Sequence, residues 1–424
     1  MASWSEQEFA TADLGDKRLN QRLAKVVSTL ASQPGKSLPA ACGSWRETKA
    51  TYRLLEQDLS WEKWFQPHWD CTLERAKAHK TVLCLQDTTE LDFNGRKATG
   101  LGKLNYAARR GIYLHPTLMV TPERLPLGVT DAWMWARNSE KQPKESLRWQ
   151  EGLRNVIELK ASLPDTRLVY VGDREADMFE LYQASRQAPG VDWLVRGKHD
   201  RALTEGGKLK QAVAEAPILG EISFTMSKGR GRKAREVVQQ IRAVSVTLKK
   251  ENLKLTALLA EERNPPEGSK AVSWLLLSNV EVTDLSTAEE LLNWYLCRWE
   301  IELFFKVLKS GCQAETAQLR SKEKLERLLV LKMIVAWRIL YLTRLNGAMP
   351  EAGCELAFEP EEWRLIYAVV KKKKPPKQAP TIRIMIRMIA SLGGFLGRKG
   401  DGEPGIKSLW QGLERCQGML LGAE

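Results

Sequence analysis

Two apolar segments of the chain each end in an aspartate. The segment VLCLQD ends at Asp87, and LVYVGD ends at Asp173. Functional side chains of an open sheet lie just beyond its strand ends, so these two carboxylates can meet if the strands are neighbours. Carboxylate oxygens are ligands that Mg²⁺ prefers. However, the chain holds 52 acidic residues, and a strand-ending aspartate is often only a turn residue, so the pair alone does not identify a metal site.

A third carboxylate, that of Glu302, belongs to a polar stripe on a predicted helix. The stripe has spacings of +3, +4, +4 and +3, which place its members on one side of a helix: Tyr295, Arg298, Glu302, Lys306 and Lys309. The remaining faces are apolar and aromatic, with Trp294, Trp299 and Phe304 among them, so we expect a largely buried helix whose stripe faces a specific partner. A carboxylate flanked by cations suits a metal ion beside a phosphate backbone. The alternative is an ordinary salt-bridged face, because Arg298–Glu302 and Glu302–Lys306 are both i,i+4 pairs.

The elements that would position these residues alternate in type. The strand-like runs TVLCLQD, IYLHPTLMV and LPLGVTDAWMW precede a helix in ESLRWQEGLRNVIELKASL, then the strand RLVYVGD and another helix. This order predicts a mixed α/β sheet, with the second and third runs as antiparallel neighbours. Mostly β runs follow from about 199 to 280 and predict a β-rich insertion. The striped helix is expected over 287–310, started by a capping box from Ser286 to Glu289, and another helix is expected over 322–345.

Both ends of the chain are predicted to be helical. Residues 1–75 contain the helix-spaced Leu23, Val26, Val27 and Leu30 beside basic residues, which predicts a small helical module with a basic surface. Such a face can dock in a DNA groove, although a solvated basic face is commoner. Residues 346–424 form a second helical region.

The charge of the chain favours a polyanionic partner. Its 65 Lys and Arg residues against 52 Asp and Glu residues give a net charge of +13. The seven cysteines are scattered singly, so no zinc or redox motif is present, and no segment is apolar enough to span a membrane. We expect a cytoplasmic protein with reduced thiols.

The stripe, read as Tyr, two residues, Arg, three residues, Glu, six residues, Lys, resembles the signature of bacterial insertion-sequence DDE transposases with a ribonuclease-H-like core. The resemblance runs nearly end to end and is closest to the transposon-five group. It is carried by LGDKRLNQRL, YRLLE, QDTTEL, GDREADMF, LVRGKH, AEERNPPEG, SWLLLS, YLCRWEIELFFKVLKSG, LGGF and SLWQGLE. It implies a ribonuclease-H-like catalytic domain over 76–345 with the β-rich insertion, an N-terminal module that binds transposon ends, and a C-terminal dimerisation region.

The resemblance also implies roles for individual residues. Asp87, Asp173 and Glu302 would be the catalytic, metal-binding carboxylates. Tyr295, Arg298, Lys306 and Lys309 would grip phosphates. Arg196 and Lys198 would line the same site, and Trp274 would stack on a base flipped from a DNA hairpin. Arg18, Arg22 and Arg53 are candidate contacts to the transposon end. The N-terminal match is patchier, so the end sequence that is recognised can differ from the family's.

The implied chemistry is metal-dependent phosphodiester hydrolysis followed by strand transfer. Two Mg²⁺ ions, or Mn²⁺, would serve each active site, the partners would be transposon-end and target DNA, and the protein would act as a homodimer. No nucleotide cofactor is expected, since the chain shows no P-loop pattern. Two alternatives remain open: a catalytically silent DNA-binding regulator, and a ribonuclease-H-like nuclease without strand transfer. The sequence leaves the recognised end, the target preference and the DNA-free oligomeric state undetermined.

Overall fold

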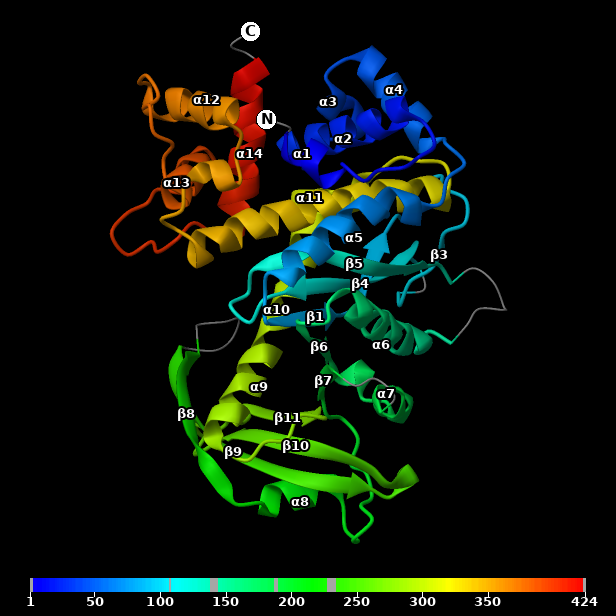
Figure 1. Ribbon diagram of the computed structural model, residues 1–424, viewed down its shortest axis with the longest axis vertical. Coiled ribbons are helices and arrows are strands. Elements are labelled where there is room, and N and C mark those ends of the chain that lie inside the picture. The colour runs from blue at the N-terminus through cyan, green and yellow to red at the C-terminus, as the bar shows by residue number, and fades with distance from the viewer. Residues whose placement is uncertain (1–2, 107, 138–143, 187–189, 227–233, 422–424) are drawn as a thin grey trace. The chain divides into compact units, whose positions relative to one another are not determined.

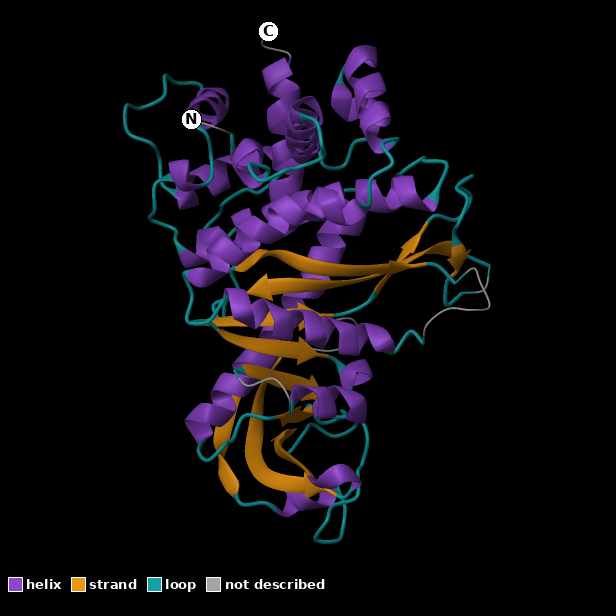
Figure 2. Ribbon diagram, turned by 45° about the vertical axis from the view of Figure 1, so that its right-hand side comes forward, coloured by secondary structure: helices purple, strands orange, loops and turns teal. Residues whose placement is uncertain are grey.

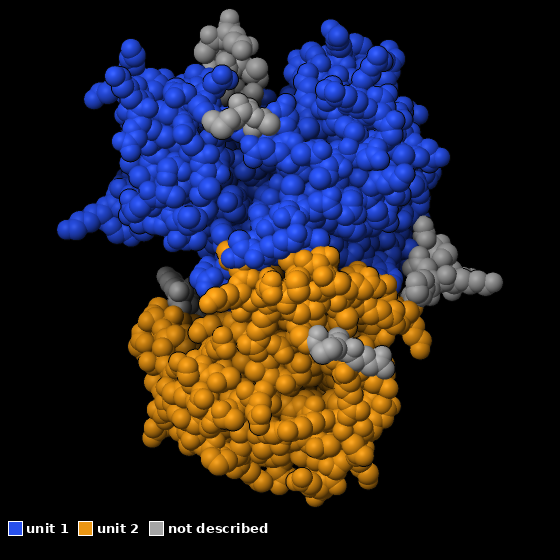
Figure 3. Space-filling view, viewed as in Figure 1, with its two compact units in different colours: residues 1–78, 88–142, 300–424 blue, residues 79–87, 143–299 orange. Residues whose placement is uncertain are grey.

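The computed structural model describes residues 3–106, 108–137, 144–186, 190–226 and 234–421. The chain forms two compact units, which are coloured separately in Figure 3. The first unit comprises Met1–Ala78, Thr88–Gln142 and Glu300–Glu424, and the second comprises His79–Asp87 and Pro143–Trp299. Each unit combines strands with helices (Figure 2), so the predicted mixed α/β class is confirmed.

The second unit is built around a sheet of parallel and antiparallel strands. Three parallel neighbours form one side of it: β1 (Thr81–Gln86), β6 (Arg167–Gly172) and β7 (Val191–Arg196). Antiparallel pairs extend the sheet from β7 through β11 (Ser273–Ser278), β10 (Leu253–Glu262), β9 (Arg235–Leu248) and β8 (Ile218–Met226). In β1 and β6 every residue after the first is buried, as expected for parallel strands covered on both faces. The predicted β runs after residue 199 are present, and β9 and β10 are the longest strands of this unit (Figure 1).

Four α-helices accompany this sheet: α6 (Leu147–Leu159), α7 (Phe179–Ser185), α8 (Leu209–Glu215) and α9 (Leu285–Cys297). Helix α6 packs against β1 and β6. The approach is close at Gly152, where an added Cβ would lie 2.1–2.4 Å from the side-chain amide of Gln86. Because Gln86 is the last residue of β1, this glycine lets α6 cover the strand up to its end.

The first unit has its own antiparallel strands. Strand β4 (Arg110–Val120) pairs with β5 (Pro126–Trp135), β2 (Thr89–Asp92) and the short β3 (Gly102–Lys103). The predicted antiparallel pairing of IYLHPTLMV with LPLGVTDAWMW is therefore confirmed.

Helices make up the rest of the first unit. The N-terminal helices are α1 (Trp4–Glu8), α2 (Lys17–Ser32), α3 (Leu38–Cys42), α4 (Trp45–Leu55) and α5 (Trp61–Lys77). The later ones are α10 (Trp299–Lys306), α11 (Lys322–Ala348), α12 (Pro360–Lys371), α13 (Ile382–Leu392) and α14 (Ile406–Leu421). No helix of the described residues is both long and apolar enough to cross a lipid bilayer.

Helix α11 is the structural centre of the first unit. It packs against β5, α2 and α5, and it is buried around most of its circumference. Its buried cations donate hydrogen bonds to backbone carbonyls of the surrounding loops and of the end of α4. Arg327 donates to Leu55 and Leu59, and Lys332 donates to Cys312 and Gln313. These bonds compensate the cost of burying charge and tie the loops to the helix.

A buried polar network joins the N-terminus to this unit. The Val129 N–H donates to His68 Nε2 at 3.0 Å, so the other ring nitrogen, Nδ1, carries the proton and donates to Glu8. Arg75 donates to both carboxylate oxygens of Glu8, at 2.9 and 3.0 Å. Its guanidinium also lies 4.3 Å from the centroid of the Trp337 ring. The network therefore links α1, α5, β5 and α11.

The start of the striped helix differs from the prediction. Asp284 caps the helix by accepting the Thr287 N–H at 2.8 Å, and α9 begins at Leu285, so the capping box at Ser286 was wrong. The expected single helix over 287–310 is divided into α9, α10 and a π-helical turn at Val307–Gly311, closed by the Cys312 N–H on the Val307 carbonyl at 2.7 Å. Trp299 was expected to be buried but is 58% exposed.

Two helical glycines are predicted to respond oppositely to alanine. Gly152→Ala should reduce the free energy of unfolding by about 1–3 kcal/mol, because the new Cβ overlaps Gln86. Gly347→Ala should increase it by about 0.5–1 kcal/mol, because this exposed position of α11 has no atom within 4 Å of the new Cβ. Urea unfolding of both variants measures the signs, and equal signs would contradict this packing.

The Glu8 network predicts a specific pH dependence. Burial alone would raise the pKa of Glu8, but the hydrogen bond from His68 and the charge of Arg75 lower it from 4.5 to about 2. Since the folded pKa lies below the unfolded value, the stabilisation is complete above pH 4.5 and is lost as pH falls towards 2. Glu8→Gln should cost about 3 kcal/mol at pH 7, and the deficit should shrink below pH 4.5 in urea unfolding.

The exposed Glu74 on α5 supplies the control for this titration. Glu74→Gln should change stability by less than about 0.5 kcal/mol at any pH, because its partner Lys77 is also exposed. A Glu8→Gln deficit that stays constant between pH 7 and pH 3 would show that Glu8 acts through packing alone.

Candidate functional site

The two strand-ending aspartates lie side by side in the second unit. Strands β1 and β6 pair in parallel from Thr81↔Arg167 to Leu85↔Val171. Asp87 and Asp173 each follow two residues after the last of these pairs, so they leave the same edge of the sheet in register. Neighbouring strands are about 5 Å apart, which places two carboxylates next to each other. The condition that the sequence left open, that these strands are neighbours, is met.

Local structure orients the carboxylate of Asp173. Asp173 is the N-cap of the short 3₁₀ helix η2 (Arg174–Ala176), and one of its oxygens accepts the Glu175 N–H at 2.7 Å. A capping bond of this kind restricts the side chain to one orientation. The carboxylate therefore stays at the strand end.

A guanidinium compensates the charge of Asp87. Arg298, which follows the last residue of α9, donates to the carboxylate at 2.8 Å, and both side chains are mostly shielded from solvent. One helical turn earlier, the buried Tyr295 lies with its ring centroid 6.0 Å from the Arg298 guanidinium. Burial raises the pKa of the Tyr295 phenol, so Tyr295 is a neutral hydrogen-bond donor at pH 7. The first two members of the predicted stripe thus face the strand ends.

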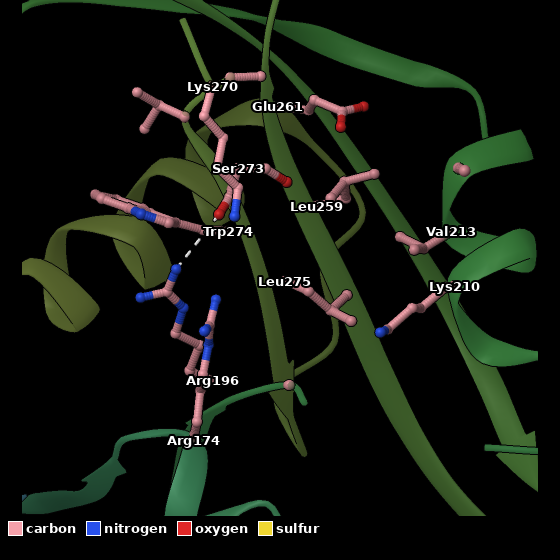
Figure 4. A pocket seen from close by; sticks show the side chains of 14 residues that line it. Arg174, Arg196, Lys210, Val213, Leu259, Glu261, Lys270, Ser273, Trp274 and Leu275 are labelled. Carbon is pink, nitrogen blue, oxygen red and sulfur yellow. Dashed lines mark hydrogen bonds between the residues drawn. The ribbon is translucent and has the colours of Figure 1, made fainter. Parts of the chain in front are cut away.

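Beside these residues lies a cavity of about 590 Å³ (Figure 4). Trp274 and Arg196 form one wall, and Trp274 meets Tyr295 edge-on, with 6.1 Å between ring centroids. Leu259 and Leu275 lie between this wall and Lys210, as Figure 4 shows. Among the residues that the structure describes, cationic side chains of the cavity lining outnumber acidic ones: the cations are Arg174, Arg196, Lys210 and Lys270, and the acid is Glu261. A flat indole beside an apolar floor and several cations suits a nucleotide.

Three of these cations were not found from the sequence. Arg174 follows Asp173 directly, so the strand-end motif itself was a usable signal. Lys210 comes from α8, and Lys270 comes from the connection between β10 and β11, where no local pattern indicates the cavity. Lys198, which was predicted beside Arg196, is exposed and is not among the residues that line the cavity.

The other stripe residues lie in the first unit. Glu302 is half-buried in the first turn of α10, and Lys306 is exposed at the end of that helix. Lys309 falls in the π-helical turn, where its amino group is 4.0 Å from the Glu315 carboxylate. The wider turn means that the regular helical spacing assumed for Lys309 does not hold.

The N-terminal candidates also belong to the first unit. Arg18 on α2 and Arg53 on α4 are exposed. Arg22 instead pairs with Glu47 of α4, which also contacts Lys25 at 3.1 Å. Arg22 therefore already has an intramolecular partner, whereas Arg18 and Arg53 face solvent.

The donor set fits a hard divalent cation. Asp87 and Asp173 present carboxylate oxygens from one sheet edge, and such ligands suit Mg²⁺ or Mn²⁺. Within the part of the chain that the structure describes, no group of three or more His, Cys, Asp or Glu side chains is gathered for a metal.

Three family models match the chain. They are described as transposase DNA-binding (residues 1–59), transposase DDE domain (residues 152–338) and transposase Tn5 dimerisation domain (residues 334–424). The DDE match contains Asp173 and Glu302, whereas Asp87 precedes it. Among solved structures, the chain is similar to one titled "Cryo-EM structure of piggyBac transposase synaptic complex with hairpin DNA", with 12% sequence identity and a TM-score of 0.39. That similarity covers 81% of this chain and 72% of the other.

The Asp87–Arg298 contact is predicted to be a coupled pair. Unfolding free energies of the wild type, Asp87→Asn, Arg298→Gln and the double variant should give a coupling energy of about 1–3 kcal/mol, because each single change removes one member of an ion pair that is largely shielded from solvent. Urea unfolding at low ionic strength measures all four values. Additive effects would mean that the contact contributes nothing to stability.

Proposed function

Because this chain belongs to the transposon-five-like DDE insertion-sequence transposases, we propose that it is a cut-and-paste enzyme that cleaves its element's ends through a DNA hairpin. The freed 3′ ends would then be joined to target DNA. The observation that carries the proposal is the in-register pair Asp87 and Asp173 at one edge of the second unit's sheet.

We assign Asp87, Asp173 and Glu302 as the catalytic carboxylates. Two Mg²⁺ or Mn²⁺ ions bound to them would activate the attacking oxygen and neutralise charge on the phosphate and the leaving oxygen. The chain itself contributes orientation, since the cap at Glu175 holds Asp173 and the Arg298 guanidinium holds Asp87.

The remaining residues would bind and orient DNA. Arg298, Tyr295 and Arg196 surround the strand ends in the second unit and would contact phosphate oxygens, with Lys198, Lys306 and Lys309 as further contacts. Trp274 would stack on an unpaired base, because its indole lies beside a cavity with an apolar floor and a cationic lining.

Recognition and assembly would use the two ends of the chain. The exposed Arg18 and Arg53 would contact transposon-end DNA, and Arg22 would do so only by exchanging Glu47 for a phosphate. We assign dimer formation on paired ends to the C-terminal region that matches the dimerisation domain. The reaction would require no nucleotide cofactor and would take place in the bacterial cytoplasm, with the bound protein associated with the nucleoid.

The test is cleavage of DNA that carries the inverted repeats flanking the protein's own gene, with Mg²⁺ or Mn²⁺. Wild type should produce nicks and then hairpins, and each of Asp87→Asn, Asp173→Asn and Glu302→Gln should reduce cleavage by at least about 10³-fold while retaining DNA binding. Gel analysis under denaturing conditions separates nicked, hairpin and joined products.

The exposed Glu290 provides the matched control, because it is a glutamate of α9, the helix that carries Tyr295, and lies off the stripe. Glu290→Gln should cut at the wild-type rate. Binding without any cleavage by the wild type would favour a silent regulator, and cleavage without joined products would favour a nuclease that lacks strand transfer.

A further inference from the structure

The carboxylate of Asp177 is buried at the strand ends of the second unit and has no role in the proposed reaction. It follows η2, four residues after Asp173, and is 2% exposed. A buried carboxylate requires several hydrogen-bond donors to offset its lost hydration. The donors that Asp177 receives therefore show what it is there to hold.

The donors come mainly from one loop, residues 197–201. Oδ2 accepts the backbone N–H groups of Lys198 and His199, at 2.5 and 2.8 Å. Oδ1 accepts the hydroxyl of Tyr182 at 2.6 Å and forms an ion pair with Arg201. Arg201 also donates to the backbone carbonyl of Asp177 at 3.0 Å. The carboxylate thus fixes the loop that directly follows β7.

The opposite side of this loop is fixed by β11. The Gly197 N–H donates to the Leu275 carbonyl at 2.8 Å, and an added Cβ on Gly197 would lie 2.9 Å from the Leu275 side chain. Arg196, one residue earlier, directs its guanidinium along the wall of the cavity beside Trp274 (Figure 4). Arg196 itself pairs with Leu276 of β11, and its guanidinium donates to the Ser273 carbonyl at 3.5 Å, while the backbone that follows it is held between Leu275 and Asp177.

The same loop also anchors the other wall of the cavity. Asp200 accepts the Lys210 N–H at 2.9 Å, and the Arg201 carbonyl accepts the Leu209 N–H at 2.9 Å. These bonds fix the first turn of α8, from which the Lys210 side chain points into the cavity (Figure 4).

The geometry points to Asp177 as a positioning residue that sets the spacing between Arg196 and Lys210, so that both cations contact phosphates of DNA held in this cavity. This inference rests on the proposed function for the identity of the ligand. The hydrogen bonds around Asp177 are observed whether or not the proposed function is correct.

The test compares Asp177→Asn with Asp192→Asn. Asp192 pairs with Arg167 across the same two strands, β6 and β7, but at their opposite ends, so its variant controls for general loosening of these strands. An asparagine at 177 keeps the volume but replaces one acceptor by a donor. Hydrogen exchange should accelerate at least about 10-fold in residues 197–201 of Asp177→Asn and stay unchanged there in Asp192→Asn.

A second readout measures binding of a DNA duplex closed by a hairpin, followed by fluorescence anisotropy in the absence of a divalent cation. Asp177→Asn and Arg196→Ala should each weaken binding by about 5–20-fold, and their combination should bind no more weakly than Asp177→Asn alone, because loss of the Asp177 carboxylate already misplaces both Arg196 and Lys210. Asp192→Asn should bind like the wild type. If Asp177→Asn does not fold, Arg201→Gln, which removes the counter-ion of Asp177 but leaves its carboxylate, replaces it.

Two results would overturn the inference: unchanged exchange in residues 197–201, or fully additive losses of binding. Neither readout requires cleavage. A wild type that binds the hairpin duplex but never cuts would therefore reject the proposed reaction while the role of Asp177 is still decided by exchange and binding.

Discussion

The central constraint on this protein is electrostatic: two carboxylates are brought together at the ends of adjacent parallel strands. Carboxylates at the ends of neighbouring strands repel each other, and the shielding of Asp87 from solvent strengthens the repulsion. In the second unit, the Arg298 guanidinium compensates the charge of Asp87, and the Glu175 N–H donates a hydrogen bond to Asp173. The end of α9, the turn after β6 and the packing of α6 on β1 at Gly152 all serve to hold this compensated pair in place.

In the first unit, the main requirement is to bury the long helix α11 together with its charged side chains. Helix α11 carries Arg327, Lys332 and Arg338 at buried positions, and each of them donates to a carbonyl group of a neighbouring loop. The loops have carbonyls that need donors, and the helix has charges that need acceptors, so each satisfies the other. Together with the Glu8 network, these bonds attach chain segments that are distant in sequence to one helix.

Local patterns were enough to predict the strands that end at Asp87 and Asp173, because an apolar run that stops at an aspartate is a signal contained in a few residues. They failed where several residues were equally suited to the same structural role. Asp284 and Ser286 are both good caps, and the structure uses the first. Trp299 was assigned to a core by its type, yet it is exposed. The contact of Arg298 with Asp87, 211 residues apart in sequence, and the Asp177 bonds depend on tertiary packing that no local spacing encodes.

The hydrogen bonds that Asp177 accepts from the loop after β7 determine which residues at the edge of the cavity can be replaced. The bonds to positions 198 and 199 use backbone N–H groups, which every residue except proline possesses. The side chains at these two positions are exposed and take no part in these hydrogen bonds. The side chains at positions 198 and 199 can therefore be replaced, which changes the chemistry beside the cavity, while the backbone of residues 197–201 keeps its bonds to Asp177.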